Sequence, residues 1–396
     1  MELSFRWYGP NDVVKLTDIR QSNADYIVTS LHQIPTGEKW NYSDINERVN
    51  FIEQSHHKNS NRLKLNVIES IPVHNDIKLR KGNYRKYIDN YKDSIVNVAK
   101  NNIKTICYNF MPIIDWTRTQ IDYKLPTDGL ALRFSFIHFI IFEKFILKLP
   151  ELEERYSENL LIKAENEYKI MSERDIDNLK FSIMGGLPAS ETKYNIDEFK
   201  NMLKLYKGVS KSDLQNNFTE FIREIIPIAE ENNIKMALHP DDPPIPLLGL
   251  PRIVSTKEDY QYIFDKYDSL HNGMTFCSGS LASNFDNNVY EIFDEFHDRI
   301  NFLHLRNVII EKDKKSFYES DHLDGDVNFV KIIKMILQEE ENRKQKIENY
   351  HIPMRPDHGH CLLDDKKKEI NPGYSAIGRM KGLSEIRGIL KTLEVN

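Results

Sequence analysis

The stretch Met236-Ala237-Leu238-His239 decides the fold, because it is a short apolar run that ends in a side chain able to bind a metal ion. Three later runs end in the same way, at Cys277, His304 and Asp357. A parallel (β/α)8 barrel gathers its functional side chains at the carboxyl ends of its strands. The repeated pattern therefore predicts an α/β fold of the (β/α)8 TIM-barrel type, with a divalent metal ion at the barrel mouth.

Runs of β-forming residues alternate with helical stretches, which is typical of a parallel sheet. Seven such runs occupy residues 26–31, 64–69, 105–110, 235–239, 274–277, 300–306 and 352–357. A weaker run at residues 316–322 would supply the eighth strand of a barrel. The alternation fails in a long charged segment, so we predict one barrel domain over residues 1–396 with a largely helical insertion, residues 111–216, between strands 3 and 4. An insertion there falls on the active-site face and either caps the mouth or makes a subunit contact.

Composition excludes several classes of protein. The formal net charge of −6 disfavours a nucleic-acid partner, which usually requires a basic face. Three cysteines without a C-x-x-C pair do not make a disulfide framework. The polar N-terminus and the charges within the most apolar stretch argue against a signal peptide and a membrane span. We therefore expect a cytoplasmic protein with reduced thiols.

His239, Cys277, His304 and Asp357 would offer a divalent ion two nitrogens, one thiolate and one carboxylate. Structural zinc ligands usually come in close pairs, whereas these four lie far apart along the chain, so a catalytic ion fits better. The donor types suit Fe(II), Mn(II), Co(II) and Zn(II) and do not decide among them.

Other polar residues near the predicted strand ends are candidates for binding a substrate. These are His32, Glu69, Asn109, Arg306 and Arg355. Trp116 and Arg118 either wall and anchor an anionic substrate or form a stacking pair on the surface. Tyr374 lies in a glycine-punctuated loop, where its phenol either reaches the mouth or serves only packing.

Several motifs extend this reading over essentially the whole chain. They include Thr29-Ser30-Leu31-His32, Cys107-Tyr108-Asn109-Phe110-Met111-Pro112, His239-Pro240-Asp241-Asp242-Pro243-Pro244 and Met354-Arg355-Pro356-Asp357-His358-Gly359-His360. With these motifs the chain resembles the mannonate dehydratase family of hexuronate catabolism, the UxuA type. The resemblance implies a xylose-isomerase-like barrel that removes water from D-mannonate to give 2-dehydro-3-deoxy-D-gluconate, with Mn(II) or Fe(II) as cofactor. It also implies a small sugar-acid substrate and a homo-oligomer, expected to be a dimer.

The resemblance places the metal ligands on His239, Cys277, His304 and Asp357, the set already indicated by the strand ends. It makes His358 and Tyr374 catalytic beside Asp357, with the roles of base and acid left open between the first two. The turn at residues 281–286 departs from the family pattern. The resemblance therefore does not predict the contacts of this loop, but the implied chemistry is the same. The main alternative is a metal-dependent sugar isomerase or epimerase; an endonuclease for abasic DNA and a non-catalytic metal-binding module are weaker ones.

Overall fold

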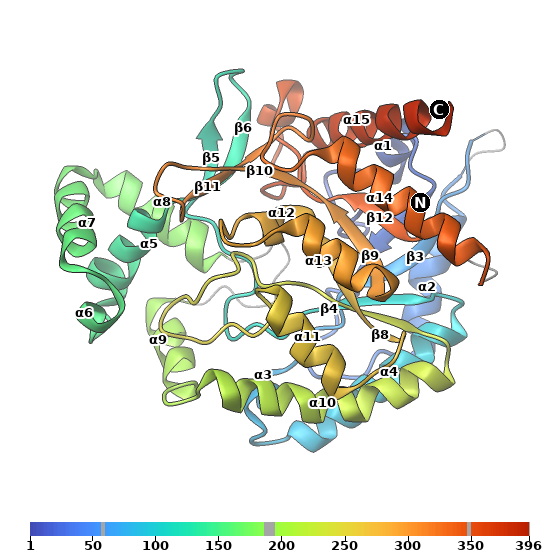
Figure 1. Ribbon diagram of the computed structural model, residues 1–396, viewed down its shortest axis with the longest axis horizontal. Helices are drawn as coiled ribbons and strands as arrows, with labels where there is room; N and C mark the ends of the chain where they lie inside the picture. The colour runs from blue at the N-terminus through green and yellow to red at the C-terminus, as the bar shows by residue number, and fades with distance from the viewer. Residues whose placement is uncertain (57–59, 186–194, 347–349, 396) are drawn as a thin grey trace.

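A closed parallel barrel of eight strands forms the centre of the molecule (Figure 1). The computed structural model describes residues 1–56, 60–185, 195–346 and 350–395. Around the barrel the order is β1 (Glu2–Arg6), β12 (Pro353–Pro356), β9 (Ile300–Leu305), β8 (Asn272–Cys277), β7 (Lys235–Leu238), β4 (Thr105–Tyr108), β3 (Lys64–Glu69) and β2 (Tyr26–Thr29). All neighbouring pairs are parallel. The predicted fold class is confirmed.

The eighth predicted strand is wrong. Residues 316–322 do not enter the barrel, because β11 (Phe317–Ser320) pairs antiparallel with β10 (Asn307–Ile310) and β6 (Leu130–Phe134). These strands and β5 (Gln120–Lys124) make a second sheet, which we call the cap sheet. The barrel is closed instead by β1, so the insertion follows the fourth barrel strand and not the third.

Helices surround the barrel and return the chain from one strand to the next. They are α1 (Leu16–Gln21), α2 (Tyr42–Glu53), α3 (Asn75–Leu79), α4 (Tyr84–Lys100), α10 (Lys211–Glu231), α11 (Lys257–Lys266), α12 (Ser278–Ala282), α13 (Val289–Phe296), α14 (Phe329–Lys344) and α15 (Ala376–Val395). The start of α10 shows how such a helix is fixed: the Ser210 hydroxyl accepts from the Asp213 amide, and the Asp213 carboxylate accepts from the Ser210 amide.

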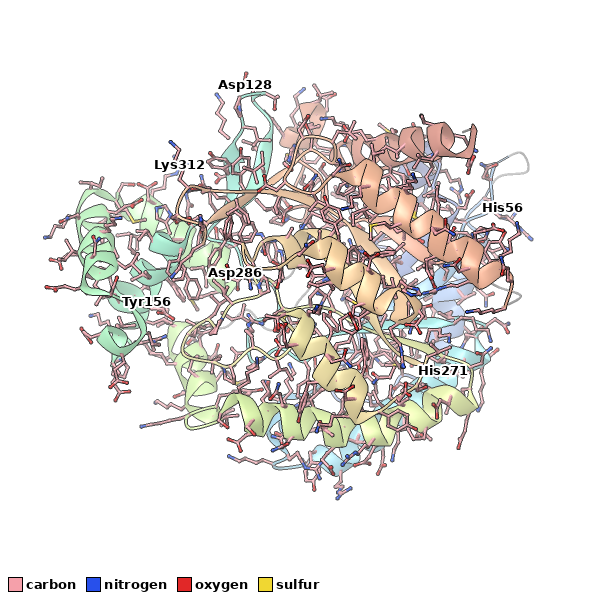
Figure 2. The ribbon with its side chains drawn as sticks, viewed as in Figure 1. His56, Asp128, Tyr156, His271, Asp286 and Lys312 are labelled. Atoms are coloured by element: carbon pink, nitrogen blue, oxygen red, sulfur yellow. The ribbon has the colours of Figure 1, made fainter. Side chains whose placement is uncertain are left out.

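The insertion contains the β5–β6 hairpin as well as helices. The helices are α5 (Phe136–Ile141), a π-helical segment (Phe142–Leu147), α6 (Leu152–Arg155), α7 (Glu158–Ile170), α8 (Glu173–Met184) and α9 (Ile196–Leu205). Figure 1 shows α5 to α8 as a group beside the barrel, apart from the helices that surround it. In Figure 2, Asp128 marks the tip of the β5–β6 hairpin, which points away from the barrel.

The register of the strands determines which side chains reach the mouth. Five buried strand residues form a small apolar cluster separate from the larger core, which includes Met236 and Leu238; they are Val28, Val67, Cys107, Ala237 and Phe302. Side chains alternate along a strand, so the residue two positions further on shares the same face. Glu69, His239 and His304 follow Val67, Ala237 and Phe302 in this way, which places all three above the cluster at the carboxyl ends of the strands.

Candidate active site and metal centre

Four potential ligands from four barrel strands converge at the mouth. The donor atoms of His239, Cys277 and His304 all lie within 4.8 Å of one another. Asp357 completes the group, since its carboxylate oxygens lie 3.5 Å from His304 Nδ1 and 3.6 Å from Cys277 Sγ. The structure therefore brings together the four residues that the strand ends predict as ligands.

The donor set fits a divalent ion. His239 Nδ1 lies 2.7 Å from the Pro240 carbonyl oxygen, which only accepts, so Nδ1 carries the proton and Nε2 keeps its lone pair. That Nε2 lies 3.0 Å from His304 Nδ1. Two nitrogens each about 2.1 Å from one ion have about this separation when they subtend an angle near 90°. With the thiol and the carboxylate, the site offers the mixed donors that Mn(II), Fe(II) and Zn(II) accept.

The carboxylate of Glu69 lies near the other ring nitrogen of His304. Glu69 Oε2 lies 3.4 Å from His304 Nε2, an atom that is buried and has no hydrogen-bond partner among the described residues. Glu69, Cys107 and His304 form a second close group of potential ligands. Burial raises the pKa of the Cys107 thiol well above its usual value, and the thiol lies 3.3 Å from the Thr275 hydroxyl. The second group is therefore a poorer place for a cation than the first.

Arginines keep the carboxylates of the mouth ionised. Arg355 binds both oxygens of Glu69, at 2.9 and 2.8 Å, and Asp357 at 2.7 Å. Arg306 lies 2.9 Å from the other oxygen of Asp357. Burial alone would raise the pKa of Asp357, but His358, Arg355 and Arg306 hold it well below its usual value. Glu69 shows the same balance, in which burial is outweighed chiefly by Arg355.

The two candidate acid–base residues lie against each other. The rings of His358 and Tyr374 are 5.1 Å apart and nearly perpendicular. Their loops are joined by the Gly359 amide, which donates to the Gly373 carbonyl at 2.8 Å. Gly373 has a φ of +81°, and a Cβ there would lie 2.7 Å from a Leu132 methyl group and 3.1 Å from the His358 ring. Only glycine fits this approach, which sets the distance between the two loops.

The remaining predicted substrate residues differ in how firmly the protein already holds them. Arg306 and Arg355 are buried and bound to carboxylates. His32 lies beside Tyr8, with a ring separation of 5.5 Å, and its buried Nε2 has no partner in the described part of the chain. Burial, with Arg6 and Arg48 nearby, lowers the pKa of His32 to about 3, so the imidazole is neutral. Asn109 directly follows β4 and is half-buried.

The surface interpretation of Trp116 and Arg118 is wrong. Arg118 is fully buried, because Asp242 and Glu319 hold its guanidinium at 2.7 and 2.8 Å. Trp116 packs over that guanidinium and presents its ring to His358, with ring centroids 5.7 Å apart. Arg118 therefore belongs to a buried ion-pair network, while Trp116 packs against His358.

Sequence reasoning missed Glu319, which binds His358. His358 Nδ1 lies 2.9 and 3.0 Å from the two carboxylate oxygens of Glu319. Burial would raise the pKa of Glu319, but His358, Arg306 and Arg118 lower it to about 2. Asp242 belongs to the same network through Arg118 and Arg306, with its pKa also well below the usual value despite burial. A charged residue inside the alternating run at residues 316–322 was the available signal.

Comparisons with known proteins show which family the chain resembles. The profile of the D-mannonate dehydratase (UxuA) family matches residues 1–396. Mannonate dehydratases from Marinomonas sp. (strain MWYL1) and Saccharophagus degradans are 44% identical over 389 residues and 45% identical over 397 residues. The alignments cover 98% and 100% of this chain, and 98% of each relative.

Solved structures lead to the same group. The crystal structure of mannonate dehydratase from Streptococcus suis serotype 2 matches with 33% identity and a TM-score of 0.76, over 99% of this chain and 94% of that one. A xylose isomerase domain protein from Planctomyces limnophilus is only 8% identical and has a TM-score of 0.50, over 99% and 96% of the two chains. The latter likeness concerns the fold alone.

Proposed function

Since the chain belongs to the D-mannonate dehydratase family and is a hydro-lyase acting on D-mannonate, we propose that it eliminates water across C2 and C3 to give 2-dehydro-3-deoxy-D-gluconate, with one Mn(II) or Fe(II) ion. The observation that carries the proposal is the convergence of His239, Cys277, His304 and Asp357 beside His358 and Tyr374. The family match does not favour the isomerase or epimerase alternative.

The chemistry must overcome two obstacles, since the C2 proton is weakly acidic and the C3 hydroxyl leaves poorly unless it is protonated. A divalent ion held by the four ligands would supply Lewis-acid stabilisation of the negative charge that develops when the C2 proton leaves. The acid–base steps fall to His358 and Tyr374, each contributing about 10² to 10⁴ in rate.

We assign the base to His358 and the acid to Tyr374. The carboxylate of Glu319 accepts from His358 Nδ1, which leaves the Nε2 lone pair to take the C2 proton. Tyr374 is buried, and burial raises its pKa, so the phenol keeps its proton at neutral pH and can donate it to the departing hydroxyl. The protons then balance: one passes from C2 to His358 and one from Tyr374 to the leaving water, which gives the enol. When the enol becomes the 2-keto acid, its hydroxyl proton returns to Tyr374 and the proton on His358 passes to C3.

Buried polar atoms without partners among the described residues suggest where substrate oxygens bind. Four of them end a barrel strand, follow one or face the acid–base pair: Arg6 Nε, His32 Nε2, Trp116 Nε1 and Arg306 Nε. An unpaired buried polar group costs free energy, which a substrate hydroxyl or carboxylate would recover. D-mannonate, with a polar group on every carbon, matches such a lining.

Assembly and location are further parts of the proposal. Ile162, Ile170 and Phe181 of α7 and α8 are 50%, 84% and 60% exposed, which supports a homodimer formed through the insertion. Within the described ranges, every helix is too short or too polar to span a lipid bilayer. A reducing cytoplasm suits a site that depends on the free thiol of Cys277.

The primary test is turnover of D-mannonate by chelator-treated protein before and after Mn(II) or Fe(II) is restored, with the 2-keto-3-deoxy acid followed as product. We expect metal-dependent product at about one bound equivalent. Metal bound without product would refute the assigned reaction, and product from metal-free protein would refute the cofactor.

Deuterium exchange separates the two acid–base roles. In D2O, Tyr374→Phe should still exchange the C2 proton of D-mannonate while forming product slowly, because the base remains. His358→Asn should lose both exchange and product while retaining bound metal. The opposite pattern would reverse the assignment.

A further inference from the structure

We propose that Glu319 is a positioning residue that holds His358 in one tautomer and one orientation; the inference rests on the role proposed for His358. Glu319 lies in β11 of the cap sheet, outside the barrel that carries the metal ligands. A residue of the cap sheet would thus determine which nitrogen of His358 carries the reactive lone pair.

The contacts define the tautomer. Both Glu319 oxygens lie within 3.0 Å of His358 Nδ1, closer than Arg306 Nη1, which is 3.3 Å away and already pairs with Asp357 at 2.9 Å. An ionised carboxylate only accepts hydrogen bonds, so Nδ1 must carry the proton. His358 Nε2 then lies on the metal-ligand side of the ring, 3.9 Å from Asp357 Oδ1, with its lone pair available.

Glu319 is itself held from several directions. Its carboxylate binds Arg118 at 2.8 Å and lies 3.6 Å from Arg306, and the side chain is 5% exposed. The backbone carbonyl of Glu319 accepts a hydrogen bond from His360 Nε2 at 2.9 Å. β11 therefore binds the loop that follows β12 at two of its residues, His358 and His360. Trp116 and Tyr374 both pack nearly perpendicular to the His358 ring. The imidazole therefore has little freedom while Glu319 is in place.

Glu319→Gln is the informative substitution, because it preserves shape and reverses one hydrogen bond. Arg118 can only donate, so the amide oxygen of the glutamine should take the place of Oε1, which lies 2.8 Å from Arg118 and 2.9 Å from His358 Nδ1, and the NH2 group should replace Oε2, 3.0 Å from the same nitrogen. That NH2 group favours a lone pair on Nδ1 and moves the proton to Nε2. We expect kcat to fall about 10²- to 10⁴-fold, the range of a wrong tautomer or misplaced base, with little change in KM.

Asp242→Asn is the matched control. Asp242 binds the same two arginines, at 2.7 Å from Arg118 and 2.8 Å from Arg306, and it reaches His358 only indirectly among the described residues, through Arg306 Nη1 at 3.3 Å from His358 Nδ1. This variant should lose stability as Glu319→Gln does and keep kcat within about threefold, since the orientation of the imidazole is retained. Bound metal and thermal stability are measured for both variants.

The proton itself provides a readout independent of turnover. In ¹⁵N-histidine protein, the Nδ1–H correlation of His358, identified by its loss in His358→Asn, should persist in Asp242→Asn and vanish in Glu319→Gln. A Glu319→Gln variant with unchanged kcat and an unchanged correlation would overturn the inference, as would an Asp242→Asn variant that loses as much kcat. Full turnover by His358→Asn would overturn the proposed role of His358, and this inference with it.

Discussion

Arg118→Met tests the buried ion-pair network. Arg118 is fully buried and lies between Asp242 and Glu319, while Arg306 remains near both carboxylates. Methionine fills similar space against Trp116 and Phe317 but leaves two buried carboxylates to one arginine. Removing one partner of a buried ion pair typically costs 3–5 kcal/mol of stability. Because Arg306 still faces both carboxylates, we expect Arg118→Met to lower the free energy of unfolding by about 3 kcal/mol.

The pKa of Glu319 fixes the pH dependence. Its folded pKa of about 2 lies below the ordinary value of 4.5, and Arg118 contributes to this difference after His358 and Arg306. A lowered folded pKa contributes stability above pH 4.5, and this contribution is lost as the pH falls from 4.5 toward 2. The deficit of Arg118→Met should therefore be largest near neutral pH and shrink below pH 4.5.

Thermal unfolding at pH 7.5 and pH 4 measures both effects. About 2.1 cal/mol/K per residue over 396 residues makes 3 kcal/mol equal to a fall in Tm of about 4 °C. Arg133→Met is the control, because its pair with Glu311 is 21% and 26% exposed and should be worth less than about 1 kcal/mol. Equal losses in the two variants, or a deficit that grows at pH 4, would refute the reasoning.

Three further substitutions probe the site, and a fourth, Cys107→Ala, serves as a control. Gly373→Ala adds a methyl group against Leu132 and the His358 ring, at a position of positive φ. We therefore expect kcat to fall at least tenfold and the free energy of unfolding to fall by about 1–2 kcal/mol. Unchanged steady-state kinetics would contradict the close packing. Tyr374→Phe should lower turnover about 10²-fold or more and leave bound metal near one equivalent; normal turnover would remove Tyr374 from the mechanism. Cys277→Ala should weaken Mn(II) binding at least tenfold by calorimetry, whereas Cys107→Ala should not, and equal effects would reassign the ligand.

The convergence of the predicted ligands followed from two regularities that act together. Side chains alternate along a strand, and parallel strands end on the same face, so an apolar run that ends in His, Cys or Asp already places that residue at the mouth. His239, Cys277 and His304 meet for this reason although the chain separates them widely. Seven of the eight barrel strands were located by their runs of β-forming residues, which alternate with helical stretches.

The predictions failed where a sequence pattern does not specify which strands pair with each other. β1 begins and ends with a charged residue, so its short sequence reads as polar, yet Phe5 is buried in the core. β11 alternates between buried and half-buried residues, as a strand in either sheet can, and its sequence does not specify β6 and β10 as its neighbours. Glu319 was missed for the same reason, since its contact with His358 crosses from one sheet to another.

The closure of the barrel by β1 has a consequence for synthesis of the chain. Residue Glu2 pairs with Pro353, so the ribosome must make some 350 further residues before the last neighbour of β1 exists. At about 5–20 residues per second, that interval lasts roughly 20–70 s. Throughout it, β1 can pair with β2 but leaves its other edge unpaired. The nascent protein therefore carries an open sheet edge near its N-terminus for most of translation, which is where a chaperone would have most to protect.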